Sequence, residues 1–166
     1  MESFGILVKS YRGDFEQAQK LLESIRIHNI DSLPVWVVVP EEDRDVFRSA
    51  THNVAELLSE SEFESHLTSE GVAGIRPGYI NQEIIKLAFW ELELVGNYLP
   101  VDSDAVFLRP FRVSDFMHEP NIPYTVLLED RELQSDPDYF LTHWQGREQT
   151  LREIQRQVGL EDRRLL

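Results

Sequence analysis

Two aspartates separated by one serine, Asp102 and Asp104, follow an apolar stretch in "YLPVDSDAVFLRPF", residues 98–111. Carboxylates at the end of a buried strand lose hydration and repel each other, so a bound cation would stabilise the pair. The side chains of an extended chain alternate between its two sides. Asp102 and Asp104 can therefore bind one common ligand only if the chain bends there, and it can bend just past the end of a strand. Carboxylate oxygens suit a hard divalent ion, Mg²⁺ or Mn²⁺. The alternative is a solvated Asp-Ser-Asp turn between two strands.

The composition limits the kinds of function that the chain can have. Its 166 residues suit one domain, and the absence of cysteine excludes disulfides and thiolate metal sites. A cysteine-free chain fits a reducing cytoplasm, and the apolar run at residues 4–8 is too short for a signal peptide or a membrane span. The net charge of −14 repels nucleic acid and anionic lipid. An anionic substrate would therefore need a few local basic groups or a cation.

Strand-like and helix-like segments alternate along the chain. After a first strand at residues 4–8, Asp14 and Gln17 form a capping-box pattern before a helix with apolar residues at helical spacing. A second, fully apolar strand is expected at Val35–Val39, and a short helix follows Pro40. The pattern then predicts a short strand at residues 55–58 and a long polar loop.

The second half of the chain continues the alternation. A long helix is expected to open at Asn81 or Gln82 and to run to about Val95. Strand 98–101, the aspartate pair, the apolar residues 105–108 as a short strand, and a further strand at 124–130 follow. The C-terminal segment is expected to be helical, with apolar residues on one face and a glycine as C-cap: Leu151, Ile154, Val158 and Gly159.

This order of elements predicts an α/β fold with a mostly parallel sheet flanked by helices. In such sheets, ligands bind beyond the carboxyl ends of the strands. The polar segments "KSYRGD", "PEED" and "DSD" each follow a strand directly. We therefore expect the loops 10–13, 40–43 and 102–104 to lie at one edge of the sheet and to form one site.

Lys86 is a charged residue inside an apolar helical run. It lies one residue after Ile85, about 100° around the helix, at the border of the face that packs on the sheet. In a helix that opens near Gln82, this cation lies close to the N-terminus, where it is unfavourable and needs an anion. The candidates are the Asp102/Asp104 pair without metal, or the diphosphate of a ligand. The alternative is a lysine whose stem covers apolar surface and whose ammonium reaches water.

The segment around the aspartate pair resembles the metal-site strand of glycosyltransferases of the GT-A type. Three other segments agree with that family in order and spacing: "ILVKSYRGDFEQAQKLLESIRIHN", "LPVWVVVPEED" and "GYINQEIIKLAFW". The resemblance covers about residues 4–130 and is nearest to a bacterial family of glycosyltransferases. It implies a GT-A-like fold, a nucleotide-sugar donor, a divalent cation (Mn²⁺ or Mg²⁺) and an acceptor that is a saccharide, a lipid or a protein.

The resemblance also implies roles for residues after the first two strands. Ser10 and Tyr11 would lie against the nucleobase and ribose, and Arg12 would contact the diphosphate or the base. Pro40 and Asp43 follow the second strand, where such enzymes often contact the base. For Arg12 a solvated loop arginine is the alternative, and for Asp43 the local pattern favours an exposed acid at a helix start.

The remaining implied roles belong to the region of the aspartate pair. Asp102 would contact the ribose or the metal, and Asp104 would bind the metal. Gln82 and Lys86 lie four residues apart, so they share a helix face that the resemblance directs toward the ligand. Two residues that follow the motif would shape the sheet edge: Arg109 and Pro110.

The implied reaction displaces a nucleoside diphosphate from an anomeric carbon by an acceptor hydroxyl. The cation would act as a Lewis acid on the leaving diphosphate. An inverting enzyme also needs a carboxylate as general base, and candidates follow the strand 124–130 or end it: Glu129, Asp130 and Glu132. His118 and His143 could each add a metal ligand, although lone histidines are more often surface or packing residues.

The chain as a whole is expected to be one GT-A-like domain, with the nucleotide-sugar and metal part at residues 1–111. Residues 112–166 would form a short acceptor side and a C-terminal helix. GT-A enzymes of this kind usually continue further past the aspartate pair. This leaves a naturally minimal enzyme, a truncated chain, or a donor-binding protein with weak or no transfer activity.

Three other classes compete with a glycosyltransferase. Phosphatases of the haloacid dehalogenase type also place an Asp-x-Asp after an apolar strand, but theirs is the first strand, and here the pair follows a late one. A catalytically inactive nucleotide-sugar or metal-binding module is the second, and a donor-hydrolysis assay separates it from an enzyme. A purely structural or interaction domain would present a large apolar patch, and the sequence shows no such stripe beyond the core. The sugar, the nucleotide, the stereochemical outcome and the oligomeric state are left open by the sequence.

Overall fold

In the computed structural model, the described residues are 4–71, 74–119, 122–124 and 137–139. The chain forms two compact units, Met1–Pro123 and Tyr124–Leu166. The described part of the second unit contains one helical turn, α5, at Pro137–Tyr139. None of the described helices has the length and apolar composition that crossing a bilayer requires.

The first unit begins with alternating strands and helices. Their bounds are β1 Gly5–Lys9, η1 Arg12–Asp14, α1 Phe15–His28, β2 Val35–Val39, η2 Glu41–Asp43, α2 Arg44–Thr51 and β3 Glu56–Ser59, where η marks a 3₁₀ turn. The next elements are η3 Glu60–Phe63, α3 Pro77–Ala88, η4 Phe89–Leu92 and β4 Tyr98–Asp102. The unit ends with η5 Val113–Asp115 and an antiparallel pair, β5 Met117–Glu119 and β6 Ile122–Pro123.

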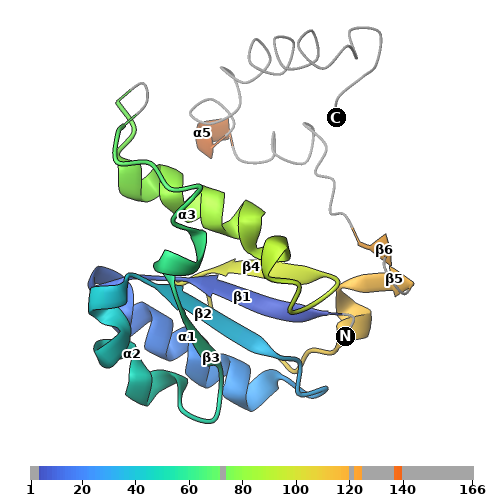
Figure 1. Cartoon of the computed structure of the whole chain (residues 1–166). Helices are drawn as coiled ribbons and strands as arrows, with labels where there is room; N and C mark the ends of the chain where they lie inside the picture. Colours follow the sequence, from blue (N-terminus) through green and yellow to red (C-terminus); the bar gives the residue numbers. More distant parts are fainter. Residues whose placement is uncertain (1–3, 72–73, 120–121, 125–136, 140–166) are drawn as a thin grey trace, which may run out of the picture. The chain divides into compact units, whose positions relative to one another are not determined.

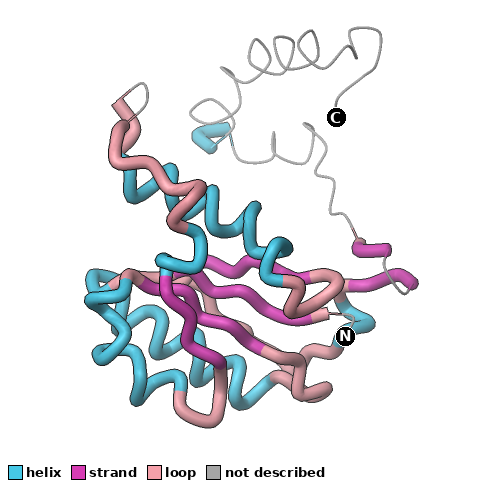
Figure 2. The backbone as a smooth tube through the Cα atoms, in the orientation of Figure 1, coloured by secondary structure: helices cyan, strands magenta, loops and turns pink. Residues whose placement is uncertain are grey.

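Four parallel strands form the central sheet in the order β3-β2-β1-β4, which Figure 2 shows as adjacent magenta segments. The predicted α/β fold with a mostly parallel sheet flanked by helices is therefore confirmed. Because β1 and β2 lie in the middle with helices on both faces, all ten of their residues are buried.

Helices cover both faces of this sheet, with α1 and α2 on one face and α3 on the other (Figure 1). Alternate residues of the strands point to the two faces, so Ile6 and Val8 pack with α1, whereas Leu7 packs with Ile85 and Phe89 on the α3 side. The apolar residues of α1 that were expected at helical spacing are buried: Ala18, Leu21, Leu22 and Ile25.

The helix before β4 differs from the prediction at both ends. It begins at Pro77 rather than at Asn81 or Gln82, because proline lacks an N–H and suits the first position of a helix. It ends at Ala88, and a 3₁₀ turn closes at Glu93, whose φ of 50° is left-handed and stops the helix before Val95.

The chain after the aspartate pair also differs from the prediction. Residues 105–108 form no strand but run beside α1, where the backbone N–H of Phe107 donates to Ser24 Oγ (3.0 Å). Further on, the backbone N–H of Phe111 donates to the carbonyl of His28 (2.9 Å). The helix, rather than the sheet, thus supplies the hydrogen-bond partners. Apart from Tyr124, which is not in a strand, the strand expected at 124–130 lies outside the described residues, as does the expected C-terminal helix.

Candidate functional site

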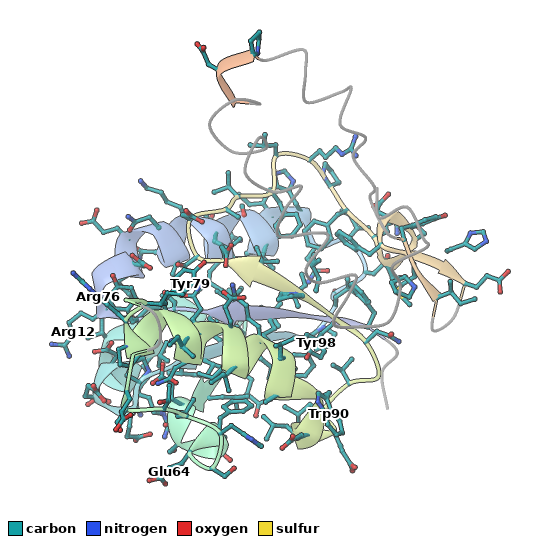
Figure 3. All side chains as sticks on the ribbon, turned by 90° about the horizontal axis from the view of Figure 1, so that it is seen from above. Arg12, Glu64, Arg76, Tyr79, Trp90 and Tyr98 are labelled. Atoms are coloured by element: carbon teal, nitrogen blue, oxygen red, sulfur yellow. The ribbon has the colours of Figure 1, made fainter. Side chains whose placement is uncertain are left out.

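The carboxyl ends of three strands meet at one edge of the sheet. Lys9, the last residue of β1, pairs with Val38 of β2 on one side and with Asp102 of β4 on the other. Because the strands are parallel, the loops that follow them leave the sheet at this edge. Figure 3 shows Arg12 beyond this end of the sheet, and Tyr98 toward the opposite end. The expectation that loops 10–13, 40–43 and 102–104 lie at one edge is confirmed.

Arg12 and Asp43 join the first two of these loops. The backbone N–H of Arg12 donates to Asp43 Oδ2 (2.7 Å), and the guanidinium Nε lies 3.1 Å from Oδ1. The guanidinium also donates to the carbonyl of Glu42 (3.1 Å). The interpretation of Asp43 as an exposed acid is wrong, because the loop after β1 covers its carboxylate and leaves only 8% of the side chain exposed.

Ser10 and Tyr11 occupy different positions in the first loop. Ser10 is buried, and its Oγ has no hydrogen-bond partner among the described residues. Tyr11 is half exposed, and its ring covers Gly13 so closely that an added Cβ there would collide with it. Tyr11 therefore offers an aromatic surface to solvent at this edge.

In the second loop, the carbonyl of Pro40 accepts the N–H of Asp43 (2.9 Å) and helps to form the turn.

Asp14 is the N-cap residue of α1, as predicted, but its side chain makes no capping hydrogen bond. Its carboxylate instead accepts a hydrogen bond from Ser103 Oγ (3.3 Å), the buried residue between the two aspartates. The contact draws the turn after β4 toward the start of α1. The turn is closed by the N–H of Ala105, which donates to the carbonyl of Asp102 (3.0 Å), and Asp104 is exposed.

Lys86 reaches the aspartate pair. Its Nζ lies 2.7 Å from Asp102 Oδ1 and 2.9 Å from Glu83 Oε1, and only 14% of its side chain is exposed. Burial lowers the pKa of Lys86, but the hydrogen bonds to Asp102 and Glu83 outweigh burial and raise it above its ordinary value. This confirms the first of the two anions that the sequence proposed. The assumed helix position was wrong, because Lys86 lies in the last turn of α3, where the helix dipole favours a cation. Gln82, one turn earlier, is half-buried.

Lys9 and Glu60 form a second ion pair at this edge, which the sequence reasoning missed. Lys9 is 6% exposed, and its Nζ lies 2.7 Å from Glu60 Oε1 and donates to the carbonyl of Ser10 (2.6 Å). The signal was present in the sequence, since Lys9 directly continues the apolar run and the strand includes it. A lysine at the end of a central strand points to one of the two covered faces and needs a buried partner.

The described residues fit a divalent cation only in part. None of the described residues form a group of three or more His, Asp or Glu side chains that could hold a metal ion. Asp102 and Asp104 nevertheless offer carboxylate oxygens, and Mg²⁺ is usually held by one or two carboxylates together with substrate phosphates and water. One of these oxygens, Asp102 Oδ1, already forms an ion pair with the ammonium of Lys86 in this structure. Among the described residues, these two carboxylates alone do not form a complete protein site for such an ion.

Other predicted site residues lie elsewhere. Arg109 and Pro110 are exposed in the segment beside α1 and belong to none of the strands. His118 follows Phe116, whose ring stacks on Phe4 at the amino end of β1 (5.4 Å), so it lies away from Asp102 and Asp104. The general-base and second histidine candidates lie outside the described residues: Glu129, Asp130, Glu132 and His143.

A family model matches residues 5–154, which is most of the chain. The chain belongs to the DUF6492 family. This family is described as one of unknown function. The match includes every strand of the central sheet and both aspartates, so the edge described above lies within the part that defines a DUF6492 chain.

Comparison of this DUF6492 chain with curated proteins gives no match. Among solved structures, the chain is similar to the crystal structure of mouse xyloside xylosyltransferase 1 in its apo form, with a TM-score of 0.48 and 11% sequence identity. The similarity covers 69% of this chain and 49% of that one, so the chain spans about half the length of that protein.

Proposed function

We propose that this chain binds a nucleotide-sugar donor and, with a divalent cation, transfers the sugar to an acceptor hydroxyl, as a metal-dependent glycosyltransferase. The observation that carries the proposal is the meeting of the loops after β1, β2 and β4 at one sheet edge, with the Asp102–Asp104 turn among them. The resemblance of four sequence segments to GT-A enzymes supports the same assignment.

The charges at this edge decide how an anionic ligand could bind. The chain carries 30 acidic and 16 basic residues, yet three cations gather at this edge: Lys9, Arg12 and Lys86. Each is paired with a carboxylate, but Lys86 contacts two carboxylates, and Asp14 and Asp104 lie at the same edge, so a diphosphate would need a divalent cation to bind there. A cation held by Asp102 and Asp104 would neutralise the charge that develops on the leaving diphosphate.

Different side chains would then contact different parts of the donor. Tyr11 would lie against the nucleobase, because its half-exposed ring is the aromatic surface of the first loop. The Arg12–Asp43 contact would hold the first two loops in place, and Lys86 would contact the diphosphate. Ser10 Oγ and Gln82 would add polar groups near the ribose and the phosphates.

Thermal unfolding in the presence of nucleoside diphosphates, with and without Mn²⁺, tests the proposal. A ligand at a hundred times its Kd adds about 2.7 kcal/mol, which raises the Tm by about 5–10 °C in a chain of this length. Asp104→Ala is expected to abolish the Mn²⁺-dependent rise while the unliganded Tm stays the same or increases, because the carboxylate is exposed and lies beside a second one, Asp102, which repels it. An Asp104→Ala protein that responds as the wild type does would contradict the metal assignment.

A donor-hydrolysis assay distinguishes the enzyme from a binding module. Release of nucleoside diphosphate from nucleotide sugars, dependent on Mn²⁺ and on Asp104, is the result expected for a transferase. Binding without release would assign the chain to the alternative, an inactive nucleotide-sugar-binding module. Absence of any nucleotide-dependent stabilisation would refute both.

A further inference from the structure

The ammonium of Lys86 lies between two carboxylates from different elements. Asp102 Oδ1 of β4 and Glu83 Oε1 of α3 lie 2.7 and 2.9 Å from its Nζ. The lysine side chain is 14% exposed, whereas the side chains of Asp102 and Glu83 are 61% and 49% exposed. A cation tethered to the protein therefore occupies the place at Asp102 where a free cation would bind, and solvent still reaches both carboxylates.

The backbone at Lys86 is fixed, so only its side chain can change partners. The hydroxyl of Tyr98, at the start of β4, donates to the carbonyl of Lys86 (2.7 Å). The ring of Tyr98 also packs edge-on against Phe89 (4.9 Å). Helical side chains lean toward the helix N-terminus, which brings the lysine stem from the last turn of α3 back to the end of β4. Figure 3 shows Tyr98 and Trp90 toward the other end of the sheet from Arg12.

A divalent ion and this ammonium compete for Asp102. Like charges a few ångströms apart repel strongly where one of them is largely removed from water. The ammonium is also held by Glu83. A free divalent ion must therefore displace a well-held cation, and the displaced ammonium needs another anion. The diphosphate of a nucleotide ligand is such an anion.

We propose that Lys86 couples cation binding to diphosphate binding: it occupies Asp102 until a diphosphate takes the ammonium and leaves the carboxylate to a divalent cation. This inference rests on the proposed function, because it names the diphosphate as the second partner of Lys86. The inference predicts that the divalent cation alone binds weakly. It also predicts that the cation raises the affinity for the nucleotide and that the nucleotide raises the affinity for the cation.

Lys86→Met tests the inference, because methionine keeps most of the stem and removes the charge. Calorimetric titration with MnCl₂ alone is expected to show that Mn²⁺ binds Lys86→Met at least about tenfold more tightly than it binds the wild type. This factor corresponds to the lower part of the range for a hydrogen bond to a charged group, because Asp102 is partly exposed. Titration with a nucleoside diphosphate at saturating Mn²⁺ is expected to show about tenfold or more weaker binding to the variant. A loss of packing alone would not shift the two affinities in opposite directions.

Two further variants serve as controls. Lys20→Met makes the same substitution at an exposed lysine of α1 and is expected to leave both affinities unchanged. Lys86→Arg keeps a cation beside Asp102 and is expected to keep Mn²⁺ binding weak, and it remains informative if Lys86→Met does not fold.

Two results would overturn the inference, and they differ from failure of the proposed function. Equal affinities of wild type and Lys86→Met for MnCl₂, with nucleotide binding intact, would show that Lys86 does not compete for Asp102. Tight binding of MnCl₂ alone to Lys86→Arg and the wild type would have the same meaning. A wild-type protein that binds no nucleoside diphosphate at saturating Mn²⁺ would instead refute the proposed function, and the inference with it.

Discussion

Asp43→Ala is expected to destabilise the protein more than Arg12→Met, although the two residues form one contact. The buried Asp43 carboxylate accepts the backbone N–H of Arg12 at 2.7 Å and lies 3.1 Å from the guanidinium. Substitution of Asp43 removes the acceptor for both groups. Substitution of Arg12 removes only the guanidinium, because every residue at position 12 except proline keeps the backbone N–H.

The expected magnitudes follow from the exposure of each group. A hydrogen bond to a charged acceptor contributes about 1.5–3 kcal/mol, and its loss leaves the Arg12 N–H unpaired in a partly buried loop. The Arg12 side chain is 64% exposed, so its ion pair contributes at most about 1 kcal/mol. We therefore expect Asp43→Ala to lower the free energy of unfolding by about 1.5–3 kcal/mol and Arg12→Met by about 0–1 kcal/mol.

Urea unfolding followed by far-UV circular dichroism measures both changes, with an unchanged m value as the sign that the unfolded states are comparable. Asp43→Asn is the matched variant, because it keeps an acceptor oxygen without the charge and should lie between the wild type and Asp43→Ala. The reasoning is refuted if Arg12→Met costs as much as Asp43→Ala, or if Asp43→Ala changes the stability by less than about 0.5 kcal/mol.

Two further predictions concern the α3 side of the sheet. Phe89→Ala should cost about 3–5 kcal/mol in urea unfolding, because the ring is 1% exposed and its centroid lies 5.4 Å from that of Trp36; a smaller loss would mean that the cavity collapses. The pKa of Lys86 is raised in the folded state, so its contribution is fully present below the ordinary value of 10.5 and is lost as the pH rises through the higher folded value. The stability difference between wild type and Lys86→Met, measured from about pH 9 to 12, should therefore shrink at the alkaline end, and a constant difference would contradict this.

Local sequence patterns predicted most elements because those elements satisfy their own preferences. The five residues of β2 are apolar, and four of them are β-branched, which suits a strand that is covered on both faces. The apolar spacing of α1 matches the face that packs on the sheet. The start of α3 was predicted wrongly, because Pro77 and Gly78 are typical of loops, and a proline is equally suited to the first turn of a helix.

The sequence by itself indicated that the aspartate pair lies at the end of a strand and that three polar loops leave the same edge of a parallel sheet. That strand, β4, includes Asp102 and is half-buried rather than buried. It also indicated that Lys86 needs an anion. Only the tertiary structure decided which groups pair: Lys86 with Asp102, Lys9 with Glu60, and Arg12 with Asp43, which lies 31 residues away. The physical reason is that strand order and register bring distant strand ends together, and that the direction of a helical side chain depends on where the helix begins and ends. The spacing of residues along the chain gives neither the strand order and register nor the exact ends of a helix.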